Sequence, residues 1–138
     1  MERKILFRGK RKNEWVVGFY FGVNPENIDI SHIVCKDKNV YEVCSKTVGQ
    51  FTNLPFNIWE GDIIQSRKHP TAKYVVIWNN HNCCFSSFHI SEYNQMNKED
   101  ELFRLNMFCN KASIKPDWLS EYQFEPIGNI HDNPELLK

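Results

Sequence analysis

The N-terminal third of the chain alternates short apolar runs with polar turns, which is typical of β-strands. Residues 5–7 are apolar, a charged turn containing glycine follows, and β-branched and aromatic residues fill 15–23. The two runs predict a hairpin, in which Gly18 marks a bulge or a close backbone approach. Two further strands are predicted at 28–34, where apolar and polar residues alternate, and at 40–45.

The middle of the chain predicts a second group of strands. Pro55 interrupts the joining segment 47–66, and proline cannot donate the hydrogen bond that a central strand requires. After a turn, residues 73–78 give the clearest strand pattern of the sequence. The segment 83–88 returns as its hairpin partner across the polar residues 79–82.

The last part of the chain predicts a helix followed by a strand. The apolar residues of 91–110 fit both a helical spacing and a strand alternation. We expect a helix, because the acidic run 99–101 suits a helix N-terminus. Residues 122–131 predict a C-terminal strand that docks onto the body of the protein and is broken at Pro126 and Gly128.

These elements predict an α+β, mostly β fold within a single domain. Residues 1–46 are expected to form an N-terminal β unit. Residues 47–90 are expected to form a small barrel-like unit of the Src-homology-3 type, by analogy at the level of fold alone. Residues 91–138 are expected to supply about one helix and the C-terminal docking strand.

Composition agrees with this class. At 138 residues with 14% aromatic side chains, the chain can build one compact β-rich core. No apolar run approaches the roughly 20 residues of a membrane span, and the N-terminus lacks the apolar region of a secretory signal. Five cysteines without an export signal indicate reduced thiols. We therefore expect a cytoplasmic protein with no membrane partner.

Charge is unevenly distributed although the formal net charge is zero. Residues 1–12 hold six basic side chains against Glu2, a net of +5, so the rest of the chain carries −5. Such a gradient can steer an anionic partner toward the basic end. The basic residues are Arg3, Lys4, Arg8, Lys10, Arg11 and Lys12.

Three stretches, taken together, resemble the YopX family of small phage and prophage proteins. They are FRGKRKNEWVVGFY at 7–20, TVGQFTNL and IWEGDII at 47–54 and 58–64, and PIGNIHDNPELL at 126–137. Their order and spacing match as well. The resemblance implies a bacteriophage or prophage origin, action inside a bacterial cytoplasm, and no catalytic residue that could be carried over.

Glu60-Gly61-Asp62 could be a pair of carboxylates that holds a divalent cation. Such a site needs further ligands from elsewhere in the chain, and no spacing identifies them. The turn interpretation requires nothing more, because Gly61 can adopt a positive φ and Asp62 can bind local backbone N–H groups before a strand. We therefore expect Gly61 and Asp62 to build a turn, as we do for Gly128 and Asn129 near the C-terminus.

His81, Cys83, Cys84 and His89 carry the imidazole and thiolate groups that zinc favours. Adjacent cysteines on a strand, however, point to opposite faces, and the spaced pair C-x₂-C is absent. The chain also lacks a phosphate-binding loop and a nucleophile elbow. The sequence therefore predicts no metal site, no cofactor and no catalytic residue.

Most aromatic residues are expected to fill the core, with one alternative. Beside the basic N-terminal segment, aromatic side chains could stack on the bases of a nucleic acid while the six cations contact its phosphates. Trp15 and Tyr20 are then the stacking candidates.

The sequence favours a non-enzymatic binding module that acts on a host or phage macromolecule. The alternative is a nucleic-acid-binding or nucleolytic protein that uses the basic N-terminal segment. Exposed β-edges and aromatic faces could also be covered by a second copy of the chain, so a homo-oligomer is compatible with the pattern.

Overall fold

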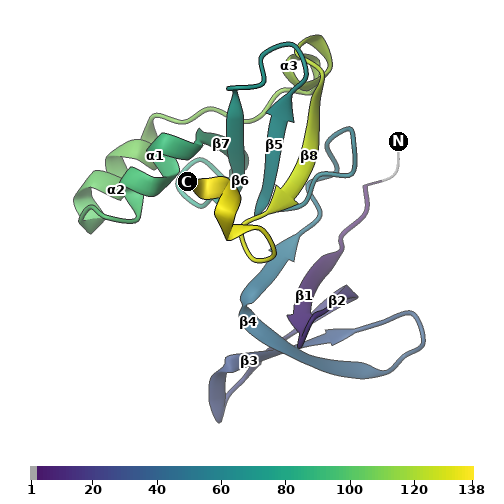
Figure 1. Ribbon diagram of the computed structural model, residues 1–138. Helices are drawn as coiled ribbons and strands as arrows, with labels where there is room; N and C mark the ends of the chain where they lie inside the picture. The colour runs from purple at the N-terminus through teal and green to yellow at the C-terminus, as the bar shows by residue number, and fades with distance from the viewer. Residues whose placement is uncertain (1–2) are drawn as a thin grey trace. The chain divides into compact units, whose positions relative to one another are not determined.

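The computed structural model describes residues 3–138, and the chain divides into two compact units, residues 1–53 and 54–138. All strands pair antiparallel, and Figure 1 labels the α-helices and the β-strands. The first unit contains strands β1 (Phe7–Arg11), β2 (Glu14–Asn24), β3 (Asn27–Val34) and β4 (Val40–Gln50).

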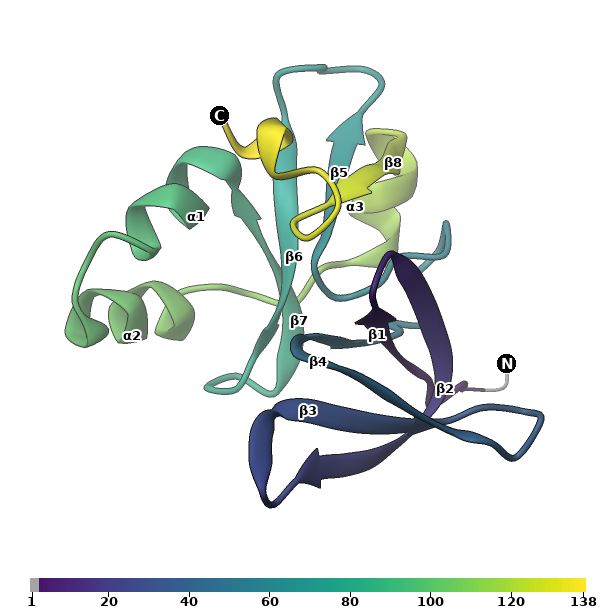
Figure 2. The same ribbon diagram turned by 60° about the horizontal axis from the view of Figure 1, so that its bottom comes forward.

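The first unit is a closed barrel in the order β1-β2-β3-β4, with β4 pairing back onto β1. Figure 2 shows these strands from a second direction. Closure depends on the length of β4, which continues past Ser45 so that Gly49 pairs with Arg8 and Gln50 with Phe7. A register shift between Arg8 and Lys10 bends the pair, as bulges do where a sheet curls onto itself.

Two glycines make room inside this small barrel. A Cβ at Gly9 would lie 2.7 Å from Val43 Cγ2, and a Cβ at Gly18 would collide with the backbone carbonyl oxygen of Val34. Among the described residues of this unit, Ile33 and Val43 are the buried large aliphatics. The barrel core is therefore narrow, and its strands approach too closely for side chains at these glycines.

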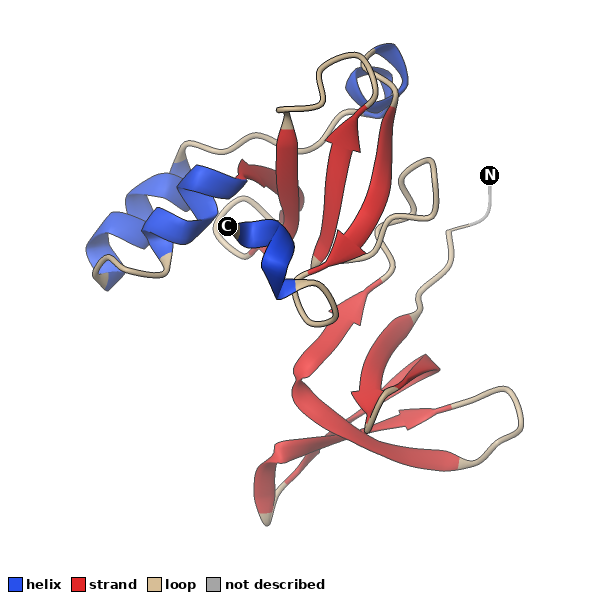
Figure 3. Cartoon of the chain, in the orientation of Figure 1, coloured by secondary structure: helices blue, strands red, loops and turns tan. Residues whose placement is uncertain are grey.

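The second unit is an open four-stranded sheet in the order β7-β6-β5-β8. Its strands are β5 (Asp62–Ser66), β6 (Lys73–Asn79), β7 (Cys84–His89) and β8 (Phe124–Asn129). The helices are α1 (Ile90–Met96), α2 (Glu101–Cys109) and α3 (Pro116–Glu121), and a 3₁₀ helix, η1 (Pro134–Leu137), ends the chain. Helices and strands are distinguished by colour in Figure 3.

Both faces of this sheet are buried. On one face Ile64 and Val76 pack with Leu119 of α3 and Phe124 of β8. The opposite side chains of the same strands, Ile63 and Val75, are also fully buried, and Phe88 of β7 contacts Phe108 of α2 with ring centroids 5.2 Å apart. Burial on both sides accounts for the continuous apolar runs of β5 and β6, because strands covered on both faces lose the alternating pattern.

The predicted α+β, mostly β class is confirmed, while the distribution of elements differs from the sequence prediction. The barrel closes within residues 7–50, whereas the segment 47–90 that was expected to be barrel-like supplies β5, β6 and β7 to the open sheet. Residues 47–50 belong to β4. The sequence pattern ended this strand at Ser45, which hid the pairing that closes the barrel.

Residues 91–110 are helical, as expected, but they form two helices, and the prediction of about one helix is too low. Asp100 is the residue immediately before α2. Its carboxylate accepts a hydrogen bond from the Phe103 N–H at 2.9 Å. This is the N-cap that the acidic run predicted. His89 caps α1, and its side chain accepts the Ser91 N–H at 3.2 Å.

The expected C-terminal strand is present as β8, which pairs with β5 at the edge of the open sheet.

Throughout the part of the chain that the structure describes, no helix is long and apolar enough to cross a membrane.

Candidate functional site

The outer side of β2 carries large apolar side chains that remain accessible to water. Successive residues of a strand point to opposite sides. Gly18 is buried and Tyr20 pairs with the buried Ile33, so these residues mark the inner side. By this alternation Val17 and Phe19 point outward, with exposed fractions of 43% and 60%. Phe21 lies at the register shift between Tyr20 and Gly22, and it is 73% exposed.

An apolar row crosses the neighbouring strands at the same level. Phe19 pairs with Val34 of β3, and Val34 pairs in turn with Val40 of β4. Directly opposed residues share one side of a sheet, so the three side chains form a continuous row. Val40 is 52% exposed. We call Val17, Phe19, Phe21, Val34 and Val40 the barrel aromatic face.

Cations lie on the next strand beside this face. Arg8 pairs with Val17, and Lys10 pairs with Trp15, so both cations share the side of the sheet that carries the barrel aromatic face. Arg8 Cζ lies 4.3 Å from the centroid of the Trp15 ring, and Lys10 Nζ lies 5.2 Å from it. These distances are those of cation–π contacts. We call Arg8, Lys10, Arg11 and Lys12 the basic edge.

An open hollow of about 270 Å³ adjoins the basic edge. Three of its cations, Lys10, Arg11 and Lys12, line it together with Asp29 and Glu42. Because both signs of charge meet there, the hollow does not by itself select an anion.

The other two predicted cations lie before β1. Arg3 and Lys4 are exposed. The backbone of Lys4 is held by Asn53, whose side chain accepts the Lys4 N–H at 2.8 Å and donates to the Lys4 carbonyl at 2.6 Å. These two hydrogen bonds fix the position of the backbone just before β1.

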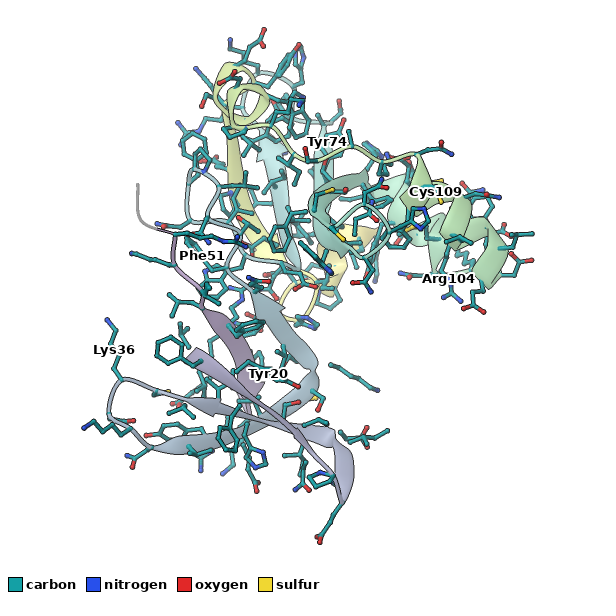
Figure 4. The ribbon with its side chains drawn as sticks, turned by 180° about the vertical axis from the view of Figure 1, so that it is seen from behind. Tyr20, Lys36, Phe51, Tyr74, Arg104 and Cys109 are labelled. Carbon is teal, nitrogen blue, oxygen red and sulfur yellow. The ribbon has the colours of Figure 1, made fainter. Side chains whose placement is uncertain are left out.

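The two predicted stacking residues lie apart from the most exposed rings. Trp15 is only half-buried, but its ring is contacted by Arg8 and Lys10. Tyr20 belongs to the inner side, where its ring lies 5.5 Å from that of Phe7, although it is 42% exposed (Figure 4). Phe19 and Phe21 were not selected as stacking candidates, and they are exceptions to the expectation that most aromatic residues fill the core.

The sequence contained one signal for these missed residues. Gly18 sits where a side chain would enter the barrel, so the residues on either side of it, Val17 and Phe19, point to the opposite side. The signal was hidden because residues 15–23 are apolar at almost every position, so no polar side chain marks the outer face.

Glu60-Gly61-Asp62 forms the predicted turn. Gly61 has φ +89°, and its N–H donates to the Val76 carbonyl at 2.7 Å. The buried Asp62 carboxylate accepts the Trp59 N–H at 2.7 Å. Asp62 thus stabilises the start of β5, the role that the turn interpretation assigned to it.

Gly128 and Asn129 differ in their roles. Gly128 lies within β8, where a Cβ would approach Asn133 Oδ1 to 2.5 Å, so a close contact rather than a turn requires glycine. Asn129 begins the turn itself, because its Oδ1 accepts the N–H groups of His131 at 3.0 Å and Asp132 at 2.9 Å.

The cysteine and histidine residues of the β6–β7 hairpin are distributed between its turn, which holds His81, and the two ends of β7, Cys84 and His89. Cys83 has φ +52° and lies in the turn, and β7 begins at Cys84. Over residues 3–138, no three side chains of His, Cys, Asp or Glu gather closely enough to hold a metal ion.

Electrostatically, the two units differ in sign. Residues 1–53 contain nine basic and six acidic side chains, a net of +3, and residues 54–138 contain eight and eleven, a net of −3. The positive unit is the one that carries the barrel aromatic face.

A small β-barrel with an exposed aromatic face, joined to an α+β unit, is thus the class of protein that the structure defines. Comparison with known protein families matches residues 6–138 to the family described as YopX protein. The chain belongs to the YopX family. Neither the curated proteins nor the solved structures give a match to it.

Proposed function

We propose that this YopX-family protein is a non-enzymatic binding module of phage or prophage origin, which acts on a host or phage macromolecule in the bacterial cytoplasm. The observation that carries the proposal is the barrel aromatic face, above all the exposure of Phe19 and Phe21. Contiguous exposed apolar surface is rare on monomeric soluble proteins and is typical of sites where a partner binds.

The barrel favours recognition through side chains. Each of its strands is hydrogen-bonded to two neighbours over part of its length, and along these paired parts there is no edge to which a partner could add a strand. Contact there is made by the outward side chains, and aromatic rings contribute much of the binding free energy in such surfaces.

Several buried polar residues of the second unit make hydrogen bonds that stabilise the fold. Asp62 and Asn129 bind backbone N–H groups in turns, and the buried Asn79 donates to the Phe108 carbonyl at 2.8 Å. Ser66 donates to the Tyr122 carbonyl at 2.6 Å. These hydrogen bonds support a structural role for the four residues.

Affinity capture from cells that carry the corresponding phage or prophage tests the proposal. The wild-type chain is compared with Phe19→Ser/Phe21→Ser and with Leu102→Ser/Leu105→Ser. The second double variant is a matched control, because Leu102 and Leu105 are exposed on α2.

We expect a partner that is retained by the wild type and by the α2 control and is lost from the barrel double variant. All three proteins should unfold at the same temperature, since exposed side chains are exchanged. Retention of the same partners by the barrel double variant would contradict the assignment of the binding surface.

A further inference from the structure

We infer that the partner of the barrel aromatic face is single-stranded DNA, with bases stacked on Phe19 and Phe21 and phosphates held by the cations around them. This inference rests on the proposed function and names the partner of the same surface. Three features carry it: the presentation of the rings, the charges that border them, and the lack of hydrogen-bonding groups on the face.

The rings are presented as a stacking platform. Phe19 and Phe21 lie two residues apart on one strand, which places their Cα atoms about 7 Å apart or less where the bulge shortens the strand. Both are more than half exposed. Adjacent exposed rings on a strand can each receive one unpaired base, and such stacking tolerates any base because every base has a π-face.

Positive charge borders the face on two sides. On the β1 side, Arg8 lies directly opposite Val17. On the other side, Lys36 and Lys38 occupy the turn that joins Val34 to Val40, and Lys36 extends away from the barrel in Figure 4. A strand that crosses the rings would thus meet cations before and after them, as required for backbone phosphates.

Glu14 pairs in register with Arg11, and Asp29 lines the hollow beside the basic edge. The two other acidic groups near the face have contacts of their own. Glu42 lies two residues from Val40 on β4, and its carboxylate is 3.9 Å from His32 Nε2. Asp37, in the turn beside Lys36, accepts hydrogen bonds from the Asn39 N–H at 2.9 Å and from the Tyr41 hydroxyl at 2.8 Å. The register rows that contain Phe19 and Arg8 carry no acid on β1 to β4.

The same charges disfavour a second copy of the chain as occupant. A twofold dimer presents the same patch on both subunits. If the barrel aromatic faces of two copies met, their two basic edges would lie at one interface. Residues 1–53 of each copy carry a net charge of +3. An anionic strand neutralises these cations, whereas a second copy doubles them.

The chemistry of the face favours unpaired DNA over duplex DNA and over RNA. In a duplex the bases stack on one another and cannot reach the phenylalanine rings. The five residues of the barrel aromatic face are Phe or Val, so no side chain there can hydrogen-bond a ribose 2′-hydroxyl. A ribose that packs against these apolar side chains would take its 2′-hydroxyl out of water without a hydrogen-bond partner. Deoxyribose avoids this free-energy cost.

Fluorescence anisotropy with labelled oligothymidylate, about 12 nucleotides long, tests the inference within the range of known site sizes. We expect Phe19→Ser/Phe21→Ser to weaken binding at least about tenfold, which corresponds to the loss of stacking on two rings. Leu102→Ser/Leu105→Ser on α2 should bind like the wild type. The oligouridylate and the matched duplex should bind more weakly than the DNA single strand.

A second pair of variants tests the charges. Arg8→Gln/Lys10→Gln should lower the slope of log affinity against log salt by about 1.4, if each cation contacts one phosphate of a single strand. Lys68→Gln/Lys115→Gln in the second unit is the control, since both lysines are exposed there, and should leave the slope unchanged. The unfolding temperature of each variant shows whether it has kept its fold. If Arg8→Gln/Lys10→Gln does not fold, Lys36→Gln/Lys38→Gln is measured in its place.

Three results would overturn the inference: no binding of oligothymidylate at low salt, binding that survives Phe19→Ser/Phe21→Ser, or tighter binding of RNA or duplex. A dimer in light scattering that Phe19→Ser/Phe21→Ser converts to a monomer would also overturn it, in favour of a second copy. If DNA does not bind while the captured cellular partner is still lost on Phe19→Ser/Phe21→Ser, this inference fails and the proposed function stands.

Discussion

The two units of this protein place their aromatic residues in opposite environments. In residues 54–138 the rings other than the exposed Phe56 are at least partly buried, the ring centroids of Trp118 and Phe124 lie 4.3 Å apart, and Phe88 is fully buried. In residues 1–53 Phe19 and Phe21 point into water. Aromatic content alone therefore does not reveal whether rings stabilise a fold or form a binding surface.

The two units also differ in the size of their hydrophobic cores. The open sheet is covered on both faces, whereas the described part of the barrel buries two large aliphatics, Ile33 and Val43. The barrel therefore depends on tight strand pairing more than on buried volume. Each unit should respond differently to the same kind of mutation.

Gly18→Val should have one of the two largest effects of the substitutions considered, together with Phe88→Ala. A side chain at Gly18 would collide with the Val34 carbonyl oxygen, which belongs to the backbone of β3 and cannot rotate away. We expect a loss of more than about 3 kcal/mol, at the upper end of overpacking effects. Amide NMR signals of residues 3–53 should lose their dispersion.

Gly9→Ala is the matched comparison for this variant. Its Cβ meets Val43 Cγ2 at 2.7 Å, a side chain that can shift, so we expect a smaller loss of about 1–2 kcal/mol. Equal tolerance of both substitutions would mean that the strands can separate and would refute the close-packed barrel.

Phe88→Ala and Phe19→Ser test the contrast between inward and outward rings. Phe88 is fully buried, so its truncation should cost about 3–5 kcal/mol through lost burial and the cavity left behind. Phe19 is 60% exposed, and its replacement should change the unfolding free energy by no more than about 0.5 kcal/mol. Chemical denaturation measures both, and a large loss for Phe19→Ser would place that ring in the core.

Much of the fold could be predicted because its strands are short and bounded by turn residues. The hairpin around 79–82, the N-cap at Asp100 and the turn at Gly61 follow from local chemistry. Barrel closure could not be predicted, because it depends on Arg8 pairing with Gly49 across most of the unit. Such pairing leaves no mark in local hydrophobic periodicity.

The candidate surface was predicted in its charge and missed in its rings. Runs of basic residues are visible in any sequence, so Arg8 and Lys10 were identified directly. Choosing Phe19 over Tyr20 requires knowing which side of β2 faces the barrel interior. That side is fixed by the inward Gly18 and by the pairing of Tyr20 with Ile33, which are properties of the folded sheet. Trp15 shares the outer side with Phe19, but its ring is contacted by Arg8 and Lys10.

Gly61→Val should destabilise the second unit by about 2 kcal/mol, because φ +89° is strained for a β-branched residue. Asp62→Ala should cost about 1.5 kcal/mol, since the Trp59 N–H loses its carboxylate acceptor. Thermal unfolding measures both. If the two variants kept full stability but lost a bound divalent ion, the turn interpretation would be wrong and a carboxylate site would replace it.

Glu92→Gln should give the smallest effect and the one that depends on pH. Burial alone would raise the pKa of Glu92, but hydrogen bonds from Lys111 Nζ at 2.8 Å and from the His89 N–H at 3.0 Å, together with the charge of Lys111, lower it. A carboxylate with a depressed folded-state pKa stabilises the protein above its unfolded pKa of about 4.3, and this stability is lost as the pH falls through the folded pKa.

We therefore expect Glu92→Gln to cost about 1 kcal/mol at pH 7, the range of a partly exposed ion pair with a helix-capping hydrogen bond. The difference from the wild type should shrink as the pH falls below about 4. Glu99→Gln, which alters an exposed residue ahead of α2, provides the control and should show neither effect. Denaturant unfolding at several pH values measures the difference, and a pH-independent cost would mean that Glu92 acts through packing rather than through its charge.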